Sequence, residues 1–255
     1  MELPSIDILL LLIATGFIAA FIDSVVGGGG IISVPALLAL GLPPNLVLGT
    51  NKLASTMSSI TSTTSFLLSG KIELKLVARL FPLSFIGAAL GTYSVTALPS
   101  EFLRPLVVIL LIVVTIYTLF KKNWGAKSTY SGVTAKKIIL LIVAATCIGF
   151  YDGFFGPGTG SFLIFVFLML GFDFVKASGN AKLLNFASNL AAFITFAMLG
   201  SIAYGYGIPM GLAMIAGALV GSRVAIKRGA AYVKPLFIGI TVVLIGKQIW
   251  ELWLK

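Results

Sequence analysis

Long apolar runs separated by short polar gaps dominate this chain. A polar stretch at 121–137, with five lysines, has five apolar segments before it and five after it. The approximate bounds are 6–22, 31–41, 50–69, 76–98 and 104–120, then 138–151, 158–171, 180–199, 207–226 and 233–254. Such runs are typical of membrane helices. The pattern predicts an all-α polytopic membrane protein whose two membrane repeats, 1–120 and 138–255, are joined by a basic cytoplasmic linker at 121–137.

The two halves also match residue by residue. Pairs at an offset of 130 include Gly49 and Gly179, Lys52 and Lys182, and Arg104 and Lys234. Pairs at an offset of 129 include Asp23 and Asp152, and Gly27 and Gly156. Chance glycine matches would not also bring lysine and aspartate into register. The matches indicate an internal duplication.

Basic residues alternate between the gaps and orient the chain. The gaps 70–79, 121–137 and 227–234 are basic, whereas 98–104 holds one Arg and one Glu and 200–206 has no charge. When the chain is traced through the predicted membrane segments, the basic gaps all fall on one side of the membrane. The positive-inside rule assigns that side to the cytoplasm. Equivalent loops of the two halves then face opposite sides. We therefore predict inverted-topology repeats with both termini outside the cytoplasm.

Three segments look too short to cross a bilayer. The segments 31–41, 138–151 and 158–171 have 11 to 14 residues, or about 17–21 Å of helix against a hydrocarbon core of about 30 Å. The first two segments of each half are therefore expected to be half-helices that meet at a glycine-rich break inside the protein.

Composition excludes several classes of function. The chain is 58% hydrophobic and only 10% charged, with a mean hydropathy of +1.09, which excludes a soluble enzyme, a DNA-binding module and a disordered chain. With no histidine and one cysteine, imidazole catalysis, a zinc motif and an intramolecular disulfide are excluded. The net charge of +10 is attributed to membrane topology. We expect no metal, cofactor or nucleic-acid partner and no enzymatic activity; no feature specifies an oligomeric state.

Glycine runs form the first candidate site. Gly27–Gly30 and Gly156–Gly158 interrupt apolar sequence, and irregular backbone at membrane depth survives only where protein or a wet cavity satisfies it. A helix that starts after such a break points free N–H groups inward, which suits an anion. The alternative is close packing of crossing helices by small residues.

Two acids form the second candidate. Asp23 and Asp152 lie within apolar sequence at equivalent positions, and an intramembrane carboxylate points to function. They are candidate coupling residues for a proton or another cation. The alternative is that each caps the next half-helix or neutralises a lysine.

Lysines flanked by polar residues form the third candidate. Lys52 and Lys182 are expected two or three residues into a helix, where the dipole disfavours them, unless they face an anion or an aspartate. The alternative is snorkelling to the interface. The candidate substrate-binding residues are Gly27, Gly28, Gly29, Gly30, Asn51, Lys52, Ser55, Gly156, Gly158, Asn180, Lys182, Asn185 and Asn189.

Several of these motifs resemble the TauE/SafE sulfite-exporter-like family. They are Phe21–Gly30, Thr50-Asn51-Lys52-Leu53, Gly149–Pro157 and Ala181–Asn185. The resemblance covers nearly the whole chain and is closest to YfcA-type bacterial members. It implies a multipass inner-membrane transporter for small sulfur-containing anions, such as sulfite or sulfonates, or similar organic acids. Pro157-Gly158-Thr159-Gly160 replaces the tetraglycine, so the two halves are expected to bind differently.

The leading hypothesis is therefore secondary transport of such anions, in the export direction, by alternating access between the repeats, with H⁺ as the expected coupling ion. A passive anion or proton channel and a non-transporting accessory subunit remain alternatives. Saturable flux against a gradient separates a transporter from a channel.

Overall fold

The computed structural model describes residues 4–99, 128–130, 132 and 134–253, and all regular structure in these residues is helical. The helices are α1 (Ile6–Val26), α2 (Gly30–Ala39), α3 (Pro44–Leu68), α4 (Leu74–Val77), α5 (Phe81–Thr96), α7 (Ala135–Phe154), α8 (Thr159–Met169), α9 (Phe174–Met198) and α10 (Tyr204–Trp253). Four stretches are long and apolar enough to cross a membrane: α1, α7, α9 and Tyr204–Gly229 of α10. The predicted all-α polytopic membrane fold is confirmed.

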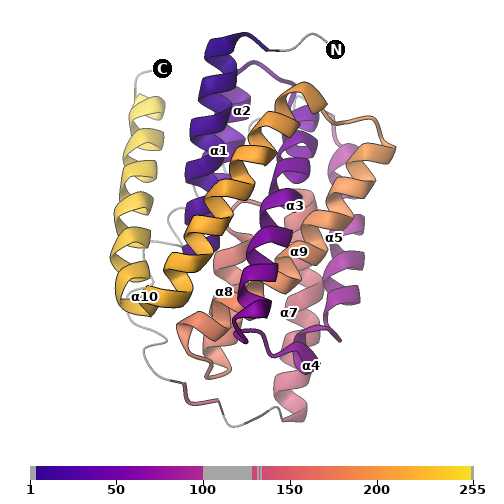
Figure 1. Ribbon diagram of the computed structural model, residues 1–255. Coiled ribbons are helices and arrows are strands. Elements are labelled where there is room, and N and C mark those ends of the chain that lie inside the picture. The colour runs from indigo at the N-terminus through magenta and orange to yellow at the C-terminus, as the bar shows by residue number, and fades with distance from the viewer. Residues whose placement is uncertain (1–3, 100–127, 131, 133, 254–255) are drawn as a thin grey trace.

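Long and short helices follow one another in the same order in both halves. A long helix, α1 or α7, precedes a short one, α2 or α8, of 10 or 11 residues. A 25-residue helix, α3 or α9, comes next in each half. In Figure 1, α1 and α2 lie in the upper part of the molecule and α7 and α8 in the lower part. The start of α1 and the end of α10 lie at the same end.

The first segment of each half was wrongly expected to be a half-helix, because α1 and α7 have 21 and 20 residues and are long enough to cross a membrane. Some predicted bounds were also wrong. Segment 138–151 is not short: α7 has 20 residues, because the side chain of Thr134 caps it by accepting the Lys137 N–H and the helix continues to Phe154. Helices α3 and α9 begin six residues before the predicted 50 and 180. Pro44 starts α3 and Asp173 caps α9, both favoured N-terminal residues that apolar periodicity does not register.

Segment 76–98 is divided between α4 and α5. The predicted gap near 227–234 corresponds to Gly229, whose non-helical backbone angles interrupt α10. Segment 104–120 lies outside the described residues.

Glycine contacts tie each half of the chain to the other. An added Cβ at Gly91 of α5 would lie 2.0 Å from the carbonyl oxygen of Phe150 in α7. At the equivalent residues, an added Cβ at Gly221 of α10 would lie 2.5 Å from the carbonyl oxygen of Phe21 in α1. Small residues of this kind let helix backbones approach closely in membranes. Helices α1 and α7 therefore both pack against the opposite half.

Helices α3 and α9 lie in the middle of the bundle (Figure 1). They pack on each other, and the Thr63 hydroxyl donates a 3.0 Å hydrogen bond to the Lys182 carbonyl. Most of their polar side chains are buried: Thr50, Asn51, Lys52, Ser58, Ser59, Ser62, Thr63, Ser178, Asn180, Lys182, Asn185, Ser188 and Asn189. A bundle interior is where polar side chains of membrane helices are expected.

Candidate functional site

Two glycine breaks meet in the interior. The first follows α1, where Gly27 and Gly28 have φ values of 77° and 97°. The second follows α7, where Gly156 has a φ of 99°; only glycine adopts such angles readily. An added Cβ at Gly27 would lie 2.4 Å from the backbone of Gly160. The two breaks therefore touch, and the bare backbone of Gly27 allows the contact.

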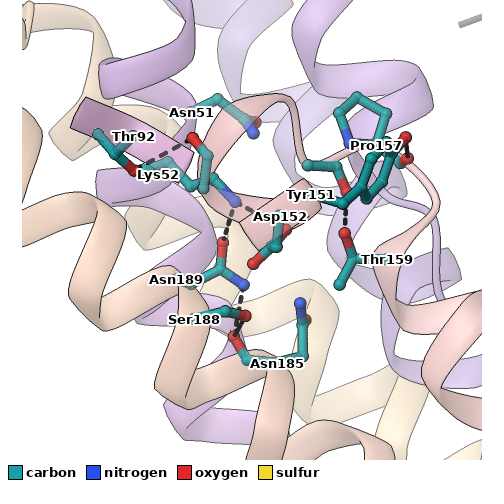
Figure 2. Close-up of polar contacts among 12 residues, drawn as sticks. Asn51, Lys52, Thr92, Tyr151, Asp152, Pro157, Thr159, Asn185, Ser188 and Asn189 are labelled. Atoms are coloured by element: carbon teal, nitrogen blue, oxygen red, sulfur yellow. Dashed lines mark hydrogen bonds and ion pairs between the residues drawn. The ribbon is translucent and has the colours of Figure 1, made fainter. Parts of the chain in front are cut away.

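Lys52 and Asp152 form a buried ion pair beside these breaks. The distance from Lys52 Nζ to Asp152 Oδ1 is 2.7 Å, and both side chains are 2% exposed. Lys52 also donates to Asn189 Oδ1 at 3.1 Å, and Asn189 Nδ2 donates to the Asn185 carbonyl at 2.8 Å. Figure 2 shows the Lys52 ammonium directed at Asp152 and Asn189. The carboxylate and the amide together compensate the buried ammonium.

Lys182 and Asp23 form the second ion pair, with 2.6 Å between Lys182 Nζ and Asp23 Oδ2. Lys182 also donates to the Asp23 backbone carbonyl. The other carboxylate oxygen of Asp23 accepts the N–H groups of Gly28 and Gly29 at 3.1 and 3.3 Å. Asp23 is less buried than Asp152, with 19% of its side chain exposed. Asp23 therefore neutralises Lys182 and also caps the glycine break between α1 and α2.

Each ion pair joins one half of the chain to the other. Lys52 comes from the first half and Asp152 from the second, whereas Lys182 comes from the second and Asp23 from the first. The expected position of the lysines near helix starts was wrong, since each is the ninth residue of its helix, α3 or α9. The carboxylates, rather than the helix dipole, decide where these lysines point.

A small polar cavity lies between the breaks and the ion pairs. Its volume is about 30 Å³, which gives room on the scale of one or two water molecules. Its lining includes the predicted residues Asp23, Gly28, Gly29, Gly30, Asn51, Lys52, Ser55, Asp152, Gly156, Gly158, Asn185 and Asn189. The structure thus gathers residues from both halves around one space.

Three predicted residues do not line the cavity. Gly27 adjoins it through Gly160, and Lys182 reaches it only through Asp23. Asn180 is engaged elsewhere, because its Oδ1 accepts the Glu73 N–H at 2.7 Å. The matched bond in the other half joins the Thr50 hydroxyl oxygen to the Ala203 N–H at 2.9 Å. Asn180 and Thr50 therefore hold loops against the bundle.

Several lining residues were not predicted: Ala19, Ala20, Ser58, Thr159, Gly160 and Met214. Ser58 belongs to a Ser/Thr-rich stretch, but which hydroxyl of that stretch faces inward depends on how α3 is rotated. Met214 carries no polar signal and comes from α10. In the described part of the chain, no three His, Cys, Asp or Glu residues gather as a metal site would require.

The comparisons with known proteins agree with this architecture. The family model "Sulfite exporter TauE/SafE" matches residues 12–247. A "Probable membrane transporter protein ORF9" of Sinorhizobium is 42% identical over 93% of this chain and 90% of its own length. A "Probable membrane transporter protein" of Haemophilus influenzae is 34% identical over 96% of both chains.

A third relative, "Probable membrane transporter protein YfcA" of Escherichia coli K12, is 33% identical over 92% of this chain and 87% of its own. A comparison with solved structures finds no significant match. The family model and these relatives both cover almost the whole chain. The chain belongs to the TauE/SafE sulfite-exporter family of membrane transporters.

Proposed function

We propose that this protein is a secondary transporter that exports small sulfur-containing or organic anions, such as sulfite or sulfonates, across a bacterial inner membrane by alternating access. One observation carries the proposal: two lysine–aspartate pairs with buried lysines, each joining opposite halves of the chain, flank one polar cavity. An ammonium group within the bilayer costs about 2.5–3.5 kcal/mol on insertion scales. Because this chain keeps two ammonium groups at matched positions, we infer that positive charge at that depth serves its function.

The anion competes with the carboxylates for the lysines. A cavity of about 30 Å³ is too small for a tetrahedral oxyanion and its contacts, so entry requires the surrounding groups to separate. The anion then takes over the Lys52 ammonium, and the released Asp152 picks up a proton. Lys182 and Asp23 form the equivalent pair. Exchange of partners links anion binding to protonation, so the anion and the proton cross together, and it loosens a contact that holds the two halves together. Export then proceeds when the outward gradient of the anion exceeds the inward gradient of protons.

Alternating access requires two halves that move relative to each other. We propose that they are inverted repeats, with boundaries at 1–120 and 138–255. Matched contacts support this, because Gly91 approaches Phe150 as Gly221 approaches Phe21. Transporters with inverted repeats commonly place their sites at the repeat interface near broken helices.

The proposed orientation puts both termini outside the cytoplasm. It rests on the basic gaps near 70–79 and 227–234, which the positive-inside rule assigns to the cytoplasm. A C-terminal reporter that is active only in the cytoplasm should therefore stay silent, whereas one active only in the periplasm should give signal. Strong cytoplasmic activity of the fusion would overturn both the orientation and the inversion.

Transport itself is tested with purified protein. We expect thermal-shift screening to show stabilisation by one or more of sulfite, thiosulfate, sulfonates and carboxylates. In proteoliposomes, flux of the stabilising anion should saturate and should proceed against its gradient when a proton gradient is imposed. Flux that rises linearly with concentration and only follows the gradient would favour a passive channel. An absence of both stabilisation and flux would contradict the proposal.

A further inference from the structure

The two equivalent carboxylates differ in how they are satisfied. Both oxygens of Asp23 have partners: Gly28 and Gly29 N–H groups at one and Lys182 at the other. Asp152 Oδ1 contacts Lys52, but Asp152 Oδ2 is buried and has no hydrogen-bond partner among the residues that the structure describes. An unsatisfied buried acceptor of this kind is costly. The asymmetry therefore calls for a physical cause.

Differences at two residues account for the free oxygen: one removes a donor, and at the other Gly158, the counterpart of Gly29, has a φ of 87° instead of −53° and makes no hydrogen bond to Asp152 Oδ2. At the offset of 129 that relates the two acids, the counterpart of Gly28 is Pro157. Proline has no N–H to donate, and its ring fixes φ near −65°. Gly28, by contrast, has a φ of 97°. Pro157 can therefore neither donate to Asp152 nor adopt the backbone conformation of Gly28.

The free oxygen belongs to a residue that lines the polar cavity. Asp152 lines it, and so does Ser58, whose buried hydroxyl is also unpartnered within the described ranges. Lys52 lines the same space. The cavity thus offers donors, from Lys52 and Ser58, next to one unused anionic acceptor. A plain oxyanion would use the donors and leave the acceptor unsatisfied.

We propose that Asp152 Oδ2 is a ligand contact that selects small oxyanions carrying a hydrogen-bond donor of their own, an N–H or an O–H group. When such a ligand first binds, before Asp152 picks up a proton, its anionic oxygens face Lys52 and Ser58 and its donor faces the Asp152 carboxylate. Pro157 creates this specificity by withholding the backbone N–H that its counterpart supplies to Asp23. The inference rests on the proposed anion site and assigns it a substrate class.

Two matched probe anions test the inference. Sulfamate and methanesulfonate each carry one negative charge at neutral pH and the same SO₃ group, but sulfamate has an NH₂ group where methanesulfonate has a methyl. Isothermal titration calorimetry of the purified protein should show sulfamate binding about tenfold or more tightly, since a hydrogen bond to a charged group contributes on that scale. This wild-type comparison needs no variant.

The Pro157→Gly variant tests the cause. It introduces an N–H beside Asp152 and leaves the Lys52–Asp152 pair in place, so the ratio of the two dissociation constants should fall to near one. Pro43→Gly, in the exposed loop before α3, is the matched control and should keep the wild-type ratio. Equal binding of both anions by the wild-type protein would overturn this inference alone. Binding of neither anion would overturn the proposed anion site as well.

Discussion

Removal of either buried lysine is expected to cost the protein both stability and anion binding. Lys52→Met leaves Asp152 buried without its ion-pair partner, and breaking a buried pair in this way typically costs about 3–5 kcal/mol. Lys182→Met should cost less, because Asp23 keeps two backbone N–H donors and is 19% exposed. Thermal unfolding of the detergent-purified variants measures the difference.

Paired substitutions separate stability from binding. Lys52→Met combined with Asp152→Asn removes both charges, so most of the lost stability should return while anion binding does not. Lys52→Ala or Lys182→Ala alone should weaken anion binding by about 1–3 kcal/mol, the scale of a charge-assisted hydrogen bond. Arginine at either position should restore the charge but not the geometry.

A lysine outside the cavity provides the control. Lys75 is exposed on α4, and Lys75→Ala should leave the dissociation constant unchanged. Lys127, in the linker, should behave in the same way; it lies outside the described residues. If both buried-lysine variants fold, insert and bind anion as the parent does, the two lysines serve only as topological anchors and the anion site lies elsewhere.

Asparagine at Asp23 or Asp152 is expected to abolish accumulation of anion against its gradient. Asparagine is nearly the same size as aspartate and keeps an acceptor for the lysine, but it cannot exchange a proton in the physiological range. Uphill uptake driven by a proton gradient should therefore stop, while exchange of labelled for unlabelled anion continues. Proteoliposome uptake with and without an imposed pH gradient separates the two activities.

The matched control for these variants is Asp173→Asn. Asp173 caps α9 by accepting the Lys176 N–H at 3.0 Å, and asparagine is an equally good cap, so coupled uptake should be retained. If the double variant Asp23→Asn, Asp152→Asn still concentrates the anion, the carboxylates have no coupling role. Capping and neutralisation would then be their whole function.

The sequence by itself determined that the protein is a bundle of membrane helices and which charged residues and glycine breaks lie at its centre. Apolar runs with few charges leave only helices as membrane-spanning structures, and the glycine breaks after Val26 and Phe154 were identifiable because glycine and proline end helices irrespective of tertiary contacts. Asp23, Asp152, Lys52 and Lys182 stood out because charge is rare in apolar sequence. Such features are local, so they can be identified from the amino-acid sequence alone.

Tertiary structure alone decided how these residues meet. Lys52 is 100 residues from Asp152 in sequence, and only tertiary packing, in which α3 and α7 both contact α9, brings the two together. Asn180 resembled a site residue in sequence yet binds a loop N–H, whereas Ser58 reached the cavity through the rotation of its helix. Helix rotation and the approach of distant backbones depend on interhelical contacts, which a linear pattern does not specify.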